Sequence, residues 1–161
     1  MNGVARALQA VNPWTALAAR LYLGGVFLAA CFHKIAHPDL FAVDVATYGI
    51  LPLALVNPMA LVLPWIELIA GAMFVVGLRV RAAALLIAGM MVVFIAAIAI
   101  ALAKGLDLSC GCFASAGAAE DPISWLTLAR DGAWLALALY VLFLDRDPIG
   151  VDRLIARRRS R

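Results

Sequence analysis

Long runs of apolar residues dominate the chain and are separated by short polar segments. A hydrocarbon core of about 30 Å requires about 20 apolar residues in a helix, so each run of that length predicts a membrane-spanning helix. The runs that qualify lie at about 14–36, 59–78, 81–103 and 124–144. We therefore expect an all-α protein, an integral membrane four-helix bundle in which residues 1–161 form a single membrane domain.

The segment between the first two runs, 37–57, is rich in apolar residues as well. Pro52 and Pro58 are expected to interrupt any helix there, because proline lacks the backbone N–H and its ring clashes with the preceding turn. We expect this segment to lie along the outer membrane interface or to cap the bundle.

Positive charges indicate the orientation of the bundle. Arg6 precedes the first run, Arg79 and Arg81 lie in the tight connection between the second and third runs, and the tail 145–161 contains six arginines. Short cytoplasmic segments carry an excess of Lys and Arg. Both termini and the basic tail are therefore predicted to be cytoplasmic, with the protein in the bacterial inner (plasma) membrane.

The overall composition agrees with a membrane protein. Hydrophobic residues make up 66% of the chain and charged residues only 14%, whereas soluble domains are nearer half apolar and a quarter charged. The net charge of +3 reflects the basic tail, which favours contact with anionic headgroups over nucleic acid. The lipid bilayer is the expected partner, and no nucleic acid is expected.

Five ionisable residues fall within or near the predicted spans, where charge is costly and usually paired: Arg20, Lys34, Glu67, Arg130 and Asp131. Arg20 lies nearer the inner face and is expected to snorkel to cytoplasmic headgroups. Glu67 and Arg130 lie at depths that permit an ion pair, and Lys34 is able to reach the same carboxylate. Asp131 is expected to pair with its neighbours or to close the outer end. These charges form either a structural ion pair that fixes the register of the helices or a functional polar pocket.

A Cys-Gly-Cys sequence follows the third run on the predicted outer side, where disulfides persist. Cys110 and Cys112, separated by Gly111 and followed by Phe113, can close only a small, strained ring, which makes a disulfide easier to reduce. Redox exchange is the favoured interpretation. A soft-metal site, with Cys31 as a third ligand, comes second, and a static disulfide third. Cys31 is either a resolving thiol or a small buried hydrophobic residue, and no metal ligand is assigned.

Together these residues resemble the MauE family of membrane proteins, within the wider DoxX-like group. The resemblance covers about residues 14–144, and Ala114 departs from it where glycine is expected. The matching residues are Arg20, Leu21, Gly24, Lys34, Phe41, Tyr48, Pro52, the run 63–68, Gly71, the run 110–113 and the run 125–131.

The resemblance implies a redox-associated membrane protein that supports maturation of disulfide-rich periplasmic proteins, notably the small subunit of methylamine dehydrogenase. It also implies a thioredoxin-fold partner in the periplasm and a role as a thiol–disulfide oxidoreductase. DsbB and vitamin K epoxide reductase are similar in plan and pass electrons between thiols and a quinone, so a quinone cofactor is an architectural analogy only. The competing interpretations are a soft-metal binding or transport protein and a non-catalytic membrane assembly factor.

Overall fold

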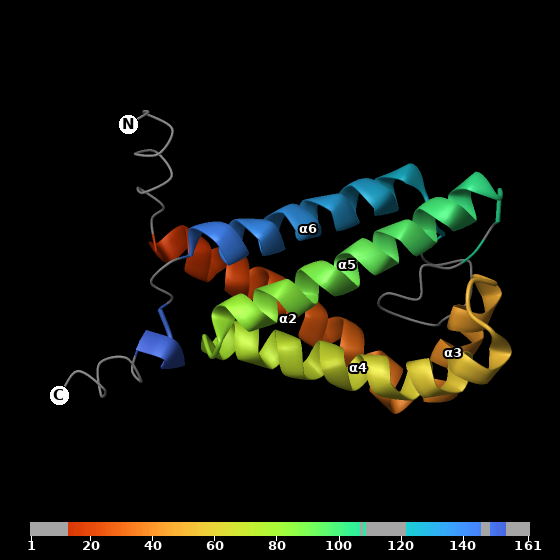
Figure 1. Ribbon diagram of the computed structural model, residues 1–161, viewed down its shortest axis with the longest axis horizontal. Coiled ribbons are helices and arrows are strands. Elements are labelled where there is room, and N and C mark those ends of the chain that lie inside the picture. The colour runs from red at the N-terminus through yellow and green to blue at the C-terminus, as the bar shows by residue number, and fades with distance from the viewer. Residues whose placement is uncertain (1–12, 107, 109–121, 146–148, 154–161) are drawn as a thin grey trace.

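The computed structural model describes residues 13–106, 108, 122–145 and 149–153 (Figure 1). This part of the chain contains four long helices: α2 (Pro13–Ala36), α4 (Leu53–Val76), α5 (Val80–Ala103) and α6 (Trp125–Leu144). Each is long and apolar enough to cross a bilayer. The prediction of an all-α bundle is therefore confirmed, and the chain is a multi-pass membrane protein.

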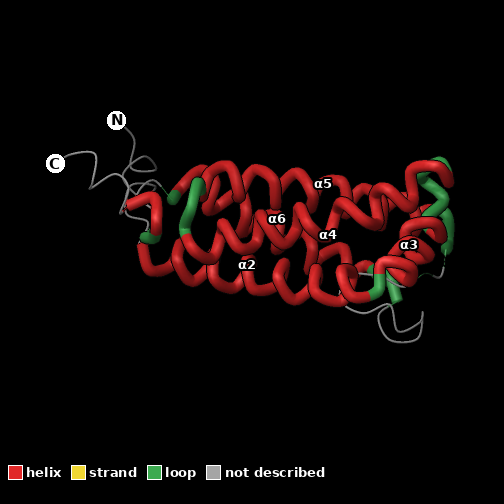
Figure 2. The backbone as a smooth tube through the Cα atoms, turned by 90° about the horizontal axis from the view of Figure 1, so that it is seen from below, coloured by secondary structure: helices red, strands yellow, loops and turns green. Residues whose placement is uncertain are grey.

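The four long helices lie side by side (Figures 1 and 2). The buried apolar residues form a large core and a smaller cluster that contains Tyr48, Ile98, Ala101 and Ile123. α2 packs most extensively against α4, and α5 against α6, while α4 with α5 and α2 with α6 complete the ring. The core includes Leu23, Phe74, Ile87 and Val141, all fully buried. A shorter helix, α3 (Pro38–Thr47), lies at the end of the bundle opposite the start of α2 and the end of α6.

Two glycines allow the close approach of α2 and α4. A Cβ atom built on Gly24 would lie 3.1 Å from the Gly71 carbonyl oxygen, and one built on Gly71 would lie 3.2 Å from the Gly24 carbonyl oxygen. Without side chains at these two positions, the helix backbones meet directly. Small residues at helix crossings are the usual source of tight packing in lipid, where apolar burial does not drive association.

The start of α4 differs from the sequence prediction. α4 begins at Leu53 and continues through both Pro58 and Pro64, so the expectation that Pro58 would interrupt a helix was wrong. Segment 37–57 is helical over most of its length, since α3 also falls within it. Each proline removes only one hydrogen bond from the ladder, and membrane helices tolerate this when packing and local adjustment satisfy the freed carbonyl.

Local signals set two of the helix boundaries. α4 ends at a Schellman-type turn, in which Gly77 has φ of 73° and the Leu78 N–H donates to the Met73 carbonyl at 2.9 Å. α6 begins with a capping box, because the Ser124 hydroxyl accepts the Thr127 N–H and the Thr127 hydroxyl accepts the Ser124 N–H, both at 3.2 Å.

Arg20 is fully buried and ties three segments together, so the expectation that it snorkels to headgroups was wrong. Its guanidinium donates to the Phe74 carbonyl at 3.1 Å, to the Asp145 carboxylate at 3.4 Å and to the Ile149 carbonyl at 3.0 Å. The planar, forked guanidinium suits three acceptors that lie in different directions. α2, the end of α4 and the segment after α6 are thereby joined.

Asp152 continues this connection to α5. Its carboxylate accepts the N–H groups of Arg79 and Val80, at 2.8 and 3.1 Å, and its own N–H donates to the Gly77 carbonyl at 2.9 Å. The first N–H groups of a helix lack partners within the helix, so Asp152 acts as a cap supplied from the far end of the chain. We call Arg20, Asp145, residues 149–152 and the turn at 77–79 the clasp.

Candidate functional site

A buried ion pair connects the last turn of α2 to the middle of α4. The Lys34 ammonium donates to both carboxylate oxygens of Glu67, at 2.9 and 3.0 Å. The side chains are only 4% and 10% exposed. The ammonium also lies 4.9 Å from the ring centroid of Phe41 on α3, where a cation–π interaction adds stabilisation. Glu67 therefore pairs with Lys34, and the alternative pairing with Arg130 is not formed.

A second ion pair lies on α6. Arg130 Nε donates to Asp131 Oδ1 at 3.2 Å, which agrees with the expected local pairing of Asp131. Asp131 is fully buried, whereas the Arg130 side chain is 32% exposed. Arg130 also lies over the Trp134 ring, 4.8 Å from its centroid. The carboxylate thus points into the bundle while the cation lies toward the surface.

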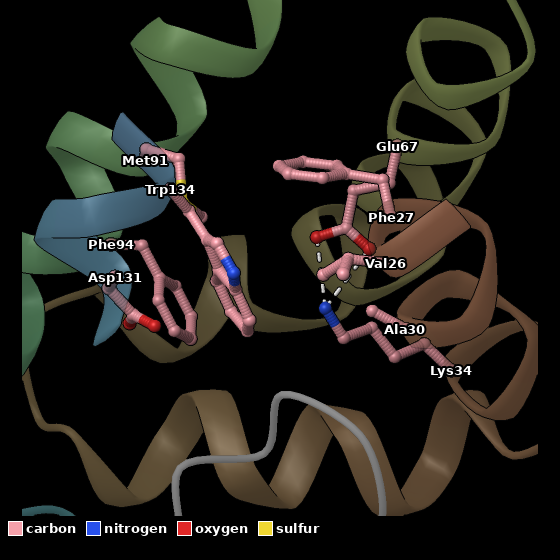
Figure 3. Close-up of a pocket in the computed structure, with 9 residues that line it drawn as sticks. All are labelled: Val26, Phe27, Ala30, Lys34, Glu67, Met91, Phe94, Asp131 and Trp134. Carbon is pink, nitrogen blue, oxygen red and sulfur yellow. Dashed lines mark hydrogen bonds and ion pairs between the residues drawn. The ribbon is translucent and has the colours of Figure 1, made fainter. Parts of the chain in front are cut away.

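The Glu67 and Asp131 carboxylates and the Lys34 ammonium face one small cavity, which we call the charged cavity (Figure 3). Lys34 and Glu67 lie on one wall with Phe27 of α2, and Asp131 and Trp134 of α6 lie on the opposite wall with Met91 and Phe94 of α5. The cavity volume is about 40 Å³. A water molecule needs about 10–15 Å³ measured in this way, so the space suits two or three waters or a small polar group.

The arrangement of charges limits what the cavity can do. Among the described residues, the cavity is lined by one cation, Lys34, and two carboxylates, Glu67 and Asp131, while Arg130 pairs with Asp131 from outside the lining. Buried pairs of this kind are costly to form and are not an efficient way to stabilise a helix bundle. Ionisable groups that share a cavity inside a membrane instead suit polar contacts with a bound group or the transfer of a proton.

Cys110, Gly111, Cys112 and Phe113 lie outside the described residues. The chain on either side of them is described, and the Ile123 N–H donates to the Leu108 carbonyl at 2.9 Å. These flanking residues lie between the end of α5 and the start of α6, at the end of the bundle where α3 lies. Asp131 follows Ile123 by about two helical turns, so the charged cavity is at the same end.

Cys31 is fully buried in α2, and its thiol donates to the Leu28 carbonyl at 3.1 Å. This environment is that of a small core residue. Within the described part of the chain, no three His, Cys, Asp or Glu side chains come together as a metal site would require. Cys31 therefore has no ligand cluster around it among these residues.

Sequence reasoning missed the aromatic walls of the cavity and the clasp. Trp134 follows Asp131 by three residues, and Phe94 follows Met91 by three, so helical spacing places each pair on one face. Trp134 is further positioned by its indole N–H, which donates to the Tyr22 hydroxyl at 3.3 Å. For the clasp, the sequence offers Arg20, a charged residue within the first apolar run, and Asp145, a charged residue immediately after the last apolar residue of α6.

Comparison with known proteins finds one family along most of the chain. The family model described as methylamine utilisation protein MauE matches residues 12–144. A methylamine utilization protein MauE of Paracoccus denitrificans is 33% identical over 132 residues, which cover 81% of this chain and 70% of that protein. A protein of the same name from Methylophilus methylotrophus is 34% identical over 143 residues, covering 88% and 74%.

A third relative, the methylamine utilization protein MauE of Methylorubrum extorquens, is 36% identical over 124 residues, covering 76% of this chain and 65% of that protein. No solved structure matches the chain. The matched range runs from the start of α2 to the end of α6 and so includes all four long helices and the charged cavity. The chain therefore belongs to the MauE family of membrane proteins.

Proposed function

We propose that this protein exchanges disulfides between its outer cysteines and a thioredoxin-fold partner in the periplasm, and thereby supports maturation of disulfide-rich periplasmic proteins. The three relatives are named for methylamine utilisation. By extension, the client is a protein of amine metabolism, of the type of the methylamine dehydrogenase small subunit. The protein lies in the inner membrane, with the basic tail in the cytoplasm and Cys110 and Cys112 on the periplasmic side.

The exchange step conserves atoms and electrons. A thiolate of the partner attacks one sulfur of the Cys110–Cys112 disulfide and forms a mixed disulfide, and the other cysteine leaves as a thiolate. The second thiol of the partner then loses its proton and attacks the mixed disulfide. The partner leaves oxidised and both cysteines of this chain are reduced. The same steps in reverse transfer two electrons from the cysteines of this chain to the partner.

One observation carries the proposal: the charged cavity lies at the same end of the bundle as Leu108 and Ile123, which flank the cysteines. Ion pairs buried in a membrane span are function candidates, and a cavity with room for water at this end of the bundle suits the proton transfers that exchange requires. In this proposal Lys34, Glu67, Arg130 and Asp131 supply polar groups that assist the exchange, and the thiols carry the redox chemistry.

Thiol trapping in native membranes tests both the topology and the chemistry. A membrane-impermeant maleimide is expected to label Cys110 and Cys112 from outside only after a reductant has been added. Cys112→Ser and Cys110→Ser variants, with Cys31→Ser as the matched control, are then mixed with the oxidised or reduced periplasmic thioredoxin-fold protein. Each outer variant is expected to accumulate a mixed disulfide or to lose exchange, whereas Cys31→Ser exchanges at the wild-type rate.

Two outcomes contradict the proposal. Outer thiols that stay reduced in oxidising medium, and become reactive only after a chelator is added, indicate soft-metal binding. Wild-type exchange by both Cys110→Ser and Cys112→Ser, with client maturation intact, indicates an assembly factor that uses no thiol chemistry.

A further inference from the structure

A second cavity lies where α4 and α5 separate. The two helices leave their shared turn at residues 77–79 and diverge toward the end of the bundle where α3 lies (Figure 1). The cavity has a volume of about 150 Å³ and is lined by α3, the segment after it, α4 and α5. It is distinct from the charged cavity, which is about 40 Å³ and is lined by α2, α4, α5 and α6.

The walls of the larger cavity are almost entirely apolar. Three aromatic side chains line it, Phe41 and Tyr48 near α3 and Phe94 on α5, with Met59 and Leu63 of α4 opposite. Asp44 of α3 also lines the cavity, but almost all of the lining surface is apolar. An apolar occupant therefore gains dispersion contacts with these side chains.

The mouth of the cavity faces hydrocarbon. Val93 of α5 lines the cavity and is 61% exposed on the outside of the bundle. It precedes the end of α5 at Ala103 by ten residues, or about 15 Å at the helical rise. Because the hydrocarbon core is about 30 Å thick, this position is close to the middle of the bilayer. Molecules dissolved in the membrane interior therefore have a route to the cavity past Val93.

The dimensions favour a ring over a lipid tail. The lining residues on α4 and on α5 are each four positions apart, Met59 with Leu63 and Val93 with Ala97, so the cavity is about 6 Å along either helix. A lipid chain extends through about 15 Å, half of the hydrocarbon core, so only part of a chain fits along one helical turn. An apolar cavity of about 150 Å³ does hold a benzene ring, and aromatic walls favour edge-to-face or offset contacts with one.

The two cavities share a wall. Phe94 lines both of them, and Phe41 lines the larger cavity while its ring lies 4.9 Å from the Lys34 ammonium. A ring in the apolar cavity is therefore separated from Lys34 and Glu67 by a single layer of aromatic side chains.

We propose that the cavity between α3, α4 and α5 is a binding site for a membrane-dissolved molecule that carries one six-membered ring, which enters past Val93. The site is formed by described residues alone and goes beyond the proposed disulfide exchange. Its test uses no cysteine chemistry, so either proposal can fail without the other.

The test uses the full chain in phosphatidylcholine nanodiscs with 3-trifluoromethyl-3-phenyldiazirine, a photoreactive molecule with one benzene ring. Mass spectrometry locates the labelled peptides. Labelling of residues 41–51, 59–63 and 93–97 is expected to saturate with probe concentration and to be displaced by toluene. Labelling of the outer, lipid-facing surface rises linearly and is not displaced.

Two matched variants separate the cavity from the surface. Ala97→Phe places a ring inside the cavity and is expected to abolish saturable labelling, whereas Ala96→Phe adds the same ring on the exposed face of α5 and leaves it unchanged. If Ala97→Phe unfolds at a different midpoint from wild type, Leu63→Trp, which fills the cavity from α4, is used in its place. The proposal is overturned if a folded cavity-filling variant still shows saturable labelling. It is also overturned if a phosphatidylcholine with the diazirine in its acyl chain labels the same residues saturably.

Discussion

The Lys34 ammonium donates to both carboxylate oxygens of Glu67, at 2.9 and 3.0 Å, and so joins the end of α2 to the middle of α4 inside the bundle. The pair is nearly sealed from solvent, and neither charge has a second oppositely charged partner within 4 Å among the described residues. Loss of one member leaves the other buried and uncompensated. The contribution of the pair can therefore be tested by comparing single and double variants of Lys34 and Glu67.

Glu67→Gln is expected to destabilise the protein by about 3–5 kcal/mol, because it leaves a buried ammonium without its counter-charge. The double variant Lys34→Met with Glu67→Met removes both charges and is expected to recover most of that loss. Thermal unfolding midpoints of the purified full chain measure both effects. If the double variant is as unstable as Glu67→Gln, the coupling inferred from the geometry is absent.

The same double variant separates structure from function. In the proposed mechanism, a folded Lys34→Met, Glu67→Met protein exchanges disulfides more slowly than wild type, because two of the polar groups that assist the exchange are gone. The measurement is the rate of exchange with the thioredoxin-fold partner. A wild-type exchange rate in the folded double variant would show that the ion pair takes no part in the exchange.

Arg20→Lys is expected to open the clasp. A lysine ammonium cannot reach the carbonyls of Phe74 and Ile149 and the Asp145 carboxylate together, and charge-assisted hydrogen bonds are worth about 1.5–3 kcal/mol each. Hydrogen exchange at residues 149–153 is expected to speed up together with a lower unfolding midpoint. Arg81→Lys, at an exposed position in the first turn of α5, is the control and should change neither.

Asp152→Ala removes the cap on α5 and is expected to cost about 1–2 kcal/mol, because the N–H groups of Arg79 and Val80 lose their acceptors. Asp152→Asn retains one acceptor oxygen and should fall between wild type and Asp152→Ala. Unfolding midpoints rank the three proteins. Equal stability of Asp152→Ala and wild type would contradict the capping role.

Gly71→Ala is expected to separate α2 from α4. The new methyl group would lie 3.2 Å from the Gly24 carbonyl oxygen and 3.2 Å from Phe27 Cβ, so the helices must move apart at a cost of about 1–3 kcal/mol. Gly25→Ala is the matched control, since no atom lies within 4 Å of its added Cβ. It should be neutral or stabilising, because alanine is the better helix former. Unfolding midpoints that shift equally in both variants would show that helix propensity, and not the crossing, decides the outcome.

The sequence by itself determined the four spans, since a long apolar run must hide its backbone polar groups within a helix wherever it lies in the bilayer. It also singled out Lys34, Glu67, Arg130 and Asp131, because charge within such a run is costly enough to be visible without a structure. The extent of α4 was misjudged. Whether a helix continues through Pro58 depends on the packing around the freed carbonyl of the preceding turn, which is not a local property of the sequence.

Only the tertiary structure decided which charges pair. Depth along a helix can be estimated from residue number, but the direction of a side chain depends on which helices are neighbours and how each is rotated about its axis. Hence Glu67 meets Lys34, while Arg130 pairs beside it on α6. Arg20 illustrates the same limit, because its partners lie 54, 125 and 129 residues away and come together only when the segment after α6 folds back onto the turn between α4 and α5.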